Sequence, residues 1–255
     1  MRSPVGAELL DDIAASGDVR QRHRHRIVGV PSRQAVAFHS VTSITSITTM
    51  SQLKLTYFNF HGGRGEPTRL ALHMGGVAFE DHRFGFADFP EIRKSAPLGQ
   101  VPVLEVDGVR VTQSDAITRY AGKLAGLYPT DALQALLCDE VMQAVEDANV
   151  HVGASFGLTG DALKEARTNL VEGPLPKYLG WLQTQLQAHG GRYFADQRLT
   201  IADLKVFVFL RGLMSGQLDH VPTDLVARHA PALGAFVQRI AETPAIAQYY
   251  AKSKA

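Results

Sequence analysis

Three short groups of residues in this sequence have side chains and positions that could bind a small peptide. Tyr57 ends an alternating, β-prone segment just before a glycine-rich turn, where a phenol can project past a sheet edge. Val101-Pro102-Val103 places a proline inside an apolar run, which is typical of an edge or a bend. Gln113-Ser114-Asp115 opens a helix, and a helix N-terminus favours a carboxylate. Together the three groups predict a site for a peptide's backbone and carboxylate.

Each group also has a purely structural explanation. Pro102 could be a plain edge proline, but a cis bond before it would turn an edge N–H and C=O outward to pair with an extended peptide. Ser114 is well placed as the N-cap of its helix, whose first N–H groups its hydroxyl would satisfy. Tyr57 could simply fill the core or surface of a strand. From spacing alone both explanations stay open.

Charged residues near these groups offer further contacts for an anion. Arg64 lies in the turn after Tyr57 and Arg93 follows Phe89, and guanidinium groups commonly hold anionic groups. Either arginine alone is more often a solvated surface residue. The acidic residues of the following long segment are expected to form a solvated helix face, and they are Asp139, Glu140, Glu146 and Asp147.

Several other functions lack support in the sequence. The single cysteine, Cys138, excludes a Cys-x-x-Cys thiol-exchange motif and an internal disulfide, and it is expected on the apolar face of a helix. No phosphate-binding or dinucleotide-binding glycine motif follows a strand, and the ten histidines lack metal-ligand spacing. The net charge of +1 and the absence of an apolar run of about 20 residues favour neither nucleic acid nor a membrane as partner. One cysteine fits a reducing compartment.

The elements that must position these residues form a small α/β unit. The first strand, Leu53–Phe58, is followed by a glycine-rich turn and a helix that starts at Glu66-Pro67. Asp107-Gly108 predicts a type I′ turn between two short strands. The full prediction is strands over 53–58, 77–84, 101–106 and 109–112, helices over 66–75 and 114–124, and a short helix or turn over 89–95.

After a linker at 127–130 the strand signals stop and helical periodicity takes over. Apolar residues recur at i, i+3 and i+4 over 133–148 and again over 163–186, where Gly173-Pro174 predicts a break. Thr200 to Asp203 resembles a capping box that opens an apolar helix over 204–213. Helices over 224–229 and 231–242 are expected to close the chain. The predicted fold is therefore an α/β domain followed by an all-α domain.

Residues 1–49 differ in composition from the rest of the chain. Six basic and four acidic residues give this segment a charge of +2, and it has no sustained helical or strand period. An arginine-rich, serine-containing start resembles an organellar transit peptide, although transit peptides avoid acidic residues. The alternatives are a disordered extension, or a true start at Met50.

The combined motifs resemble the glutathione S-transferase family, most closely the sigma class, which includes glutathione-dependent prostaglandin D synthases and lens S-crystallins. The resemblance covers about 52–250. It rests on LKLTYFN at 53–59, GQVPVLEVDG at 99–108, Gln113-Ser114 followed by AITRY at 116–120, and LTIAD at 199–203.

This resemblance implies a thioredoxin-like glutathione-binding domain over 52–129 and an all-α domain over 130–255, after an extension over 1–51. It implies a cytoplasmic homodimer with two glutathione sites, no metal, and no nucleic-acid or membrane partner. A location in an organelle is the alternative if 1–49 is a transit peptide.

The resemblance also assigns roles to individual residues. Tyr57 would be the catalytic tyrosine that donates a hydrogen bond to the glutathione sulfur, with Arg64 and the first helix's N-terminus adding a favourable field. Gly99, Gln100, Val101 and a cis Pro102 would contact the peptide backbone of glutathione. Gln113 and Ser114 would hold its γ-glutamyl carboxylate, and Phe89 and Arg93 would flank its glycyl end. Asp147 would contact the glutathione that the partner subunit binds.

Four differences from the family pattern bear on function. The turn from Phe58 to Gly65 is one residue longer than usual, Phe89 replaces a usual Trp, and Arg93 replaces a usual Lys. Ala154 stands where prostaglandin-synthesising members carry Trp. The resemblance implies a glutathione transferase that conjugates small hydrophobic electrophiles in detoxification. The alternatives are a prostaglandin-type isomerase and a non-catalytic, glutathione-binding structural protein.

Overall fold

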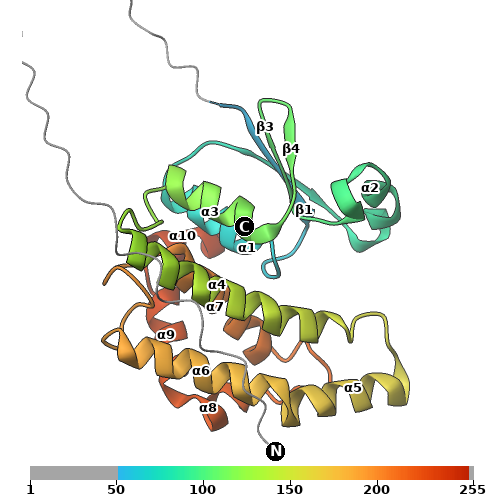
Figure 1. Cartoon of the computed structure of the whole chain (residues 1–255). Coiled ribbons are helices and arrows are strands. Elements are labelled where there is room, and N and C mark those ends of the chain that lie inside the picture. Colours follow the sequence, from blue (N-terminus) through green and yellow to red (C-terminus); the bar gives the residue numbers. More distant parts are fainter. Residues whose placement is uncertain (1–50, 253–255) are drawn as a thin grey trace, which may run out of the picture. The chain divides into compact units, whose positions relative to one another are not determined.

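The computed structural model describes residues 51–252, and the expectations for residues 1–49 lie outside this part. The chain first forms an α/β domain in the predicted order (Figure 1). Its elements are β1 (Leu53–Phe58), α1 (Glu66–Met74), β2 (Glu80–Phe84), the 3₁₀ turn η1 (Phe86–Asp88), α2 (Phe89–Ser95), the 3₁₀ turn η2 (Pro97–Gly99), β3 (Val103–Val106), β4 (Val109–Val111) and α3 (Ser114–Leu124).

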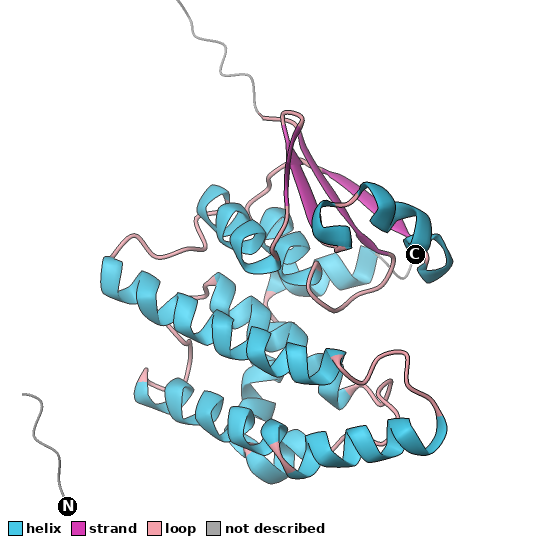
Figure 2. Ribbon diagram, turned by 45° about the vertical axis from the view of Figure 1, so that its right-hand side comes forward, coloured by secondary structure: helices cyan, strands magenta, loops and turns pink. Residues whose placement is uncertain are grey.

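The four strands form one mixed sheet in the order β2-β1-β3-β4. β1 runs parallel to β2 and antiparallel to β3, which puts Tyr57 opposite Arg83. Alternate residues of β1 are buried, as the period-2 pattern predicts. Helices α1 and α3 lie on one side of the sheet and α2 on the other (Figures 1 and 2). This is the predicted thioredoxin-like architecture, and it places the end of β1 beside the start of α1.

Two strands begin later than predicted, for local reasons. The expected second strand began at Val77, but the Val77 N–H donates to the Leu72 carbonyl at 2.9 Å and closes the end of α1. The expected third strand began at Val101, but pairing with β1 starts at Val103, after the proline that lacks an N–H. The Asp107-Gly108 turn has positive φ at both residues, 50° and 86°, as a type I′ turn requires.

The rest of the described chain is helical, as predicted. Its helices are α4 (Ala132–Gly153), α5 (Gly160–Glu172), α6 (Pro174–Ala188), α7 (Ile201–Met214), α8 (Leu225–His229), α9 (Pro231–Ala241) and α10 (Pro244–Lys252). The predicted break at Gly173-Pro174 separates α5 from α6. Helix α7 packs on α1, α4 and α9, so its residues are buried on nearly every face. It therefore joins the helical domain to the α/β domain.

Helix α10 is absent from the sequence prediction, which ended the last helix at Glu242. A signal for it was present, because Pro244 suits a first helical turn and Ile246, Tyr249 and Tyr250 recur at helical spacing. The helix packs against α1. Its two tyrosine rings lie 5.5 and 5.4 Å from the ring of His61, in the turn after β1.

The predicted capping box at the start of α7 is present and fully buried. The Asp203 carboxylate accepts hydrogen bonds from the Thr200 N–H at 2.8 Å, the Thr200 hydroxyl at 2.9 Å and the Phe194 N–H at 3.1 Å. Asp203→Ala would leave these buried donors without a partner, so we expect the free energy of unfolding to fall by about 2–4 kcal/mol in urea titrations.

The exposed cap of α4 provides a matched control for this variant. The Asp131 carboxylate accepts from the N–H groups of Leu133 and Gln134, at 3.1 and 2.9 Å, but water can replace it. Asp131→Ala should therefore cost only about 1 kcal/mol. Equal losses in the two variants would show that burial of the Asp203 donors is not what makes the capping box stabilising.

Candidate active site

A cleft of about 1070 Å³ opens between the α/β domain and the helical domain. Residues of α4 and α7 line it on the helical side, together with Tyr250 of α10. Eight of the eleven predicted site residues line the cleft on the α/β side, namely Tyr57, Arg64, Phe89, Gln100, Val101, Pro102, Gln113 and Ser114. Segments far apart in the sequence thus meet at one cavity.

Tyr57 is buried, with 5% of the residue exposed, and it lines the cleft. The backbone N–H of Arg64 donates to the Tyr57 Oη at 2.9 Å. Because the oxygen accepts this bond, the phenol hydrogen stays available for donation into the cleft. Burial raises the pKa of Tyr57 above its ordinary value, against opposing contributions from Arg64 and Arg69, so the phenol remains protonated at neutral pH.

The glycine-rich turn after Tyr57 is shaped by the tyrosine ring. A Cβ atom at Gly65 would lie 2.5 Å from the Tyr57 ring, and one at Gly63 would meet the Tyr57 hydroxyl. Gly63 also has a φ of +64°, which side chains rarely adopt. Gly65 is the N-cap of α1, so the positive end of that helix lies against the ring. Glycine at these positions lets the backbone cover Tyr57 closely.

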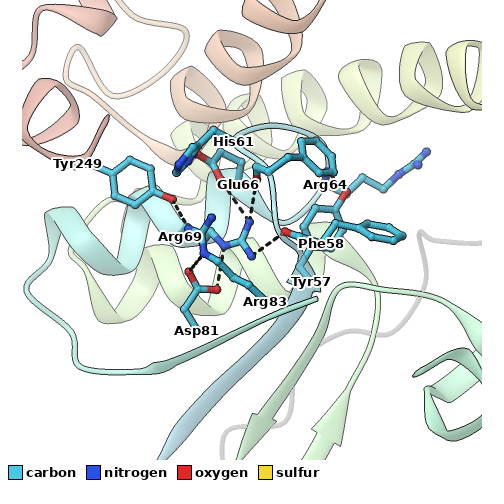
Figure 3. A network of polar contacts seen from close by, with 10 residues as sticks. Tyr57, Phe58, His61, Arg64, Glu66, Arg69, Asp81, Arg83 and Tyr249 are labelled. Atoms are coloured by element: carbon cyan, nitrogen blue, oxygen red, sulfur yellow. Dashed lines mark hydrogen bonds and ion pairs between the residues drawn. The ribbon is translucent and has the colours of Figure 1, made fainter. Parts of the chain in front are cut away.

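A buried arginine, Arg69, contacts the end of β1 and the turn after it (Figure 3). Arg69 of α1 is fully buried, and its guanidinium donates to the carbonyls of Phe58 and Phe60 at 3.1 and 3.2 Å. It also pairs with Asp81 at 2.9 Å and with the fully buried Glu66 at 3.4 Å. Arg69 thereby ties the end of β1 and the turn to α1 and β2. Arg69 was not among the residues predicted from the sequence, because its partners are close only in the folded chain.

The second predicted group, Val101-Pro102, adopts the expected cis peptide bond. Gln100, Val101 and Pro102 all line the cleft just before β3 begins. The third group, Gln113-Ser114, lines it at the start of α3. Backbone and helix-end groups of the kind predicted to hold a peptide therefore face the same cavity as Tyr57.

The prediction that Ser114 is the N-cap of α3 is wrong by one residue. Gln113 is the cap, with a φ of 77°, and no side chain caps the helix. Since Ser114 is already helical, its hydroxyl turns toward the Glu146 Oε2, at 3.5 Å. That hydroxyl is thus directed along the cleft wall rather than at its own helix.

Glu146 of α4 belongs to a charged cluster rather than to a solvated helix face, which corrects the sequence prediction for this residue. It accepts from the Arg64 Nε at 2.6 Å and from the Lys205 Nζ at 3.0 Å. Lys205 of α7 is buried and also contacts Asp115. Burial raises the pKa of Asp115 above its ordinary value, and the ammonium group of Lys205 only partly opposes this shift. Lys205 was missed because it stands in an apolar helix segment, where a lone lysine carries no motif.

Asp139 also departs from the expected solvated face. Its carboxylate is paired with Arg119 at 3.0 Å and accepts from the Tyr128 hydroxyl at 3.0 Å. Glu140 and Asp147 are exposed, as predicted for that face.

Three predicted site residues do not line the cleft. Arg93 lies beside it, 5.6 Å from the centroid of the lining residue Phe89, and Gly99 packs against Arg93. Asp147 is exposed on α4, away from the cleft of its own chain. Its predicted role across a dimer, and the roles of Arg93 and Gly99, stay predictions.

The helical side of the cleft is largely apolar. Val152, Phe156 and Val208 line it, with Leu213 and Leu218 beyond them. Ala154 stands at the position where prostaglandin-synthesising members of the family carry Trp, and it is exposed and does not line the cleft. Phe156, two residues later, supplies an aromatic ring instead. This side can therefore accept an apolar molecule next to the Tyr57 hydroxyl.

Other chemistry has little support within residues 51–252. No group of three or more His, Cys, Asp or Glu side chains in this part could hold a metal ion. Cys138 is buried, and burial raises the pKa of its thiol to about 11, which makes it a poor nucleophile. Among the described helices, none is long and apolar enough to cross a membrane.

Two protein-family models match the chain. The N-terminal domain of glutathione S-transferases matches residues 53–123, and the C-terminal domain of glutathione S-transferases matches residues 146–253. Among curated proteins, Glutathione S-transferase 3 of Caenorhabditis elegans is 31% identical over 80% of this chain and 97% of its own length. Hematopoietic prostaglandin D synthase of Gallus gallus is 32% identical over the same shares.

Solved structures show the same relationship. Prostaglandin synthase D of Nilaparvata lugens superimposes with a TM-score of 0.70 at 32% identity, covering 79% of this chain and 98% of that one. The Fasciola hepatica sigma class GST gives a TM-score of 0.69 at 29% identity, covering 81% and 98%.

Proposed function

The chain belongs to the glutathione S-transferase family, and on that premise we propose that its cleft activates the glutathione thiol at Tyr57 and transfers it to small hydrophobic electrophiles. The observation that carries this proposal is the Tyr57 hydroxyl. It is protonated, belongs to a residue that lines the cleft, and keeps its hydrogen for donation because its oxygen accepts the Arg64 N–H. A donor fixed in this way can stabilise a thiolate before it attacks a carbon atom.

The thiolate needs more than one favourable interaction. A free thiol has a pKa near ~8.5, and ionising it at neutral pH requires a shift of about 2 units, or roughly 3 kcal/mol. A hydrogen bond to a charged group contributes about 1.5–3 kcal/mol. The N-terminus of α1, which lies against the Tyr57 ring, supplies an additional positive field. Arg64 adds little net charge there, since Glu146 pairs with it.

We assign the peptide part of glutathione to the α/β side of the cleft. Gln100 and Val101, before Pro102, hold the backbone of the cysteinyl residue as an added strand. Gln113 and Ser114 hold the γ-glutamyl carboxylate at the start of α3, where free N–H groups favour an anion. Phe89 flanks the glycyl end, with Arg93 and Gly99 beside it.

The family further supports a homodimer, in which Asp147 contacts the γ-glutamyl amine bound by the partner subunit. Its exposure on α4 leaves it accessible to a second copy. We also propose detoxification in the cytoplasm, and domain limits of 52–129 and 130–255.

Binding and turnover test this function separately. Capture of the protein on immobilised glutathione, with elution by free glutathione, would show binding. A panel of electrophiles that includes a dinitrohalobenzene would then show conjugation. Tight binding with no turnover of any electrophile would instead favour a non-catalytic, glutathione-binding protein.

Isomerisation of a prostaglandin is the second candidate function, and it rests on the 32% identity to relatives named prostaglandin D synthase. It uses the same thiolate and differs only in the acceptor. Incubation with prostaglandin H2 and analysis of the products distinguishes it from conjugation.

We predict that Ser114→Ala raises the KM for glutathione about tenfold and leaves kcat nearly unchanged. In the proposed complex the hydroxyl contacts the γ-glutamyl end. Its loss therefore weakens the binding of glutathione equally in the ground state and in the transition state. Steady-state kinetics with varied glutathione measures this. Ser95→Ala is the control, because the Ser95 hydroxyl is exposed on α2 and donates to the Ile92 carbonyl. A fall in kcat without a rise in KM would contradict the assignment.

A further inference from the structure

Arg211 places a positive charge on the helical wall of the cleft. It follows Val208 by three residues on α7, and both line the cleft together with Leu213. Arg211 is exposed, so its guanidinium is open to solvent and to a molecule bound in the cleft.

The cations of the cleft differ in how they are paired. Arg64 and Lys205 are both bound to the Glu146 carboxylate, and Lys205 also contacts Asp115. Arg211 has no ion pair or hydrogen bond to any residue in the described range 51–252. Its contact is with an aromatic ring, since its Cζ lies 3.9 Å from the centroid of Tyr250. The excess positive charge of the cleft is therefore at Arg211.

The contact with the Tyr250 ring holds the guanidinium near the cleft without using its hydrogen-bond donors. A guanidinium is planar, and its N–H groups point outward in that plane, away from a ring stacked on its face. Two of them can bind one carboxylate side by side. The stacked geometry also reduces the side-chain freedom that binding would otherwise remove.

We propose that Arg211 binds a carboxylate of the electrophile, so that the acceptor substrates are amphipathic acids, with an apolar reactive body and an anionic end. This deepens the proposed transferase function and rests on it. The apolar body lies against Val208 and Phe156, and the acid end reaches Arg211. The electrophilic carbon then faces the thiolate at Tyr57.

An α,β-unsaturated carbonyl compound that carries a terminal carboxylate fits this description. The glutathione thiol first loses its proton to solvent. The thiolate forms a sulfur–carbon bond at the β-carbon while the carbon–carbon π bond breaks, and that electron pair moves onto the carbonyl as an enolate. The α-carbon then takes a proton from water, so no oxidant, reductant or leaving group is needed. The acid end takes no part in bonding and serves only to hold the substrate.

Matched substrates and variants test the proposal. We would measure kcat/KM for unsaturated ketones with a terminal carboxylate, over a series of chain lengths, and for their methyl esters, at saturating glutathione. Arg211→Met should lower kcat/KM for the best acid about tenfold and change that of its ester less than about twofold. In the unaltered protein, added salt should lower kcat/KM for the acid more than kcat/KM for the ester.

Arg228→Met is the control variant, because Arg228 is an arginine outside the cleft that pairs with Asp224 on α8. Arg228→Met should leave kcat/KM unchanged for both the acid and the ester. Equal effects of Arg211→Met on acid and ester, or no effect on either, would overturn the proposal while leaving the transferase function intact. No turnover of acid or ester by the unaltered protein would overturn this inference, while the assay with a dinitrohalobenzene decides separately whether the protein is a transferase.

Discussion

Replacing Tyr57 by phenylalanine is expected to lower kcat/KM for conjugation about 10- to 100-fold. The change removes one hydroxyl from a buried ring and leaves the turn that covers it in place. It therefore deletes the hydrogen bond to the thiolate, which contributes about 1.5–3 kcal/mol, and each 1.4 kcal/mol is a factor of ten in rate. Because the peptide part of glutathione is held elsewhere, its KM should change little.

The same variant should change the pH profile. Without the hydroxyl the bound thiol ionises at higher pH, so activity at neutral pH falls more than activity at alkaline pH. Tyr120→Phe is the matched control, since Tyr120 is an exposed tyrosine on α3 outside the cleft. Full activity of Tyr57→Phe at neutral pH, with a dinitrohalobenzene as substrate, would contradict the role assigned to Tyr57.

Replacing Arg69 by methionine is expected to lower the free energy of unfolding by about 3–5 kcal/mol. Methionine fills much of the space, but the fully buried carboxylate of Glu66 loses its guanidinium partner and keeps the His61 Nδ1, at 2.9 Å. The carbonyls of Phe58 and Phe60 lose their donors as well. Removing the cation from a buried charge network costs this much because the buried carboxylate that remains loses most of its compensating charge.

Arg83 offers a sharp control for this effect. It donates to the same carboxylate, Asp81, at 2.7 Å, but its side chain is 24% exposed. Arg83→Met should therefore cost about 1 kcal/mol or less in the same urea titrations. Equal losses in the two variants would mean that the burial of Arg69 is not what makes its network stabilising.

Local patterns were sufficient to predict most of the fold. Alternation in β1, the Asp107-Gly108 turn and the helical period of α4 each depend on residues close together in the sequence. The misplaced start of β2 had a different cause, because the backbone of Val77 is used to close α1. Helix α10 was missed although its spacing was visible, since nothing local showed that it would pack against α1.

The site was predictable only in part, because some of its residues act through partners that lie far away in the sequence. Tyr57, Val101-Pro102 and Gln113-Ser114 stand at element ends, which expose backbone or side-chain groups whatever the rest of the chain does. Arg69 and Lys205 acquire their roles from partners that the fold brings to them, at Asp81 and Glu146. A lysine or arginine inside an amphipathic or apolar helix gives no local signal of such partners.

The most direct test of the central claim is the ionisation of the glutathione thiol in the complex. The ultraviolet absorbance of the thiolate, followed against pH at saturating glutathione, reports its pKa on the protein. We expect a pKa about 2 units below the ~8.5 of a free thiol, and in Tyr57→Phe a pKa that returns part of the way toward ~8.5. A bound thiol that titrates near 8.5 in the unaltered protein would contradict it.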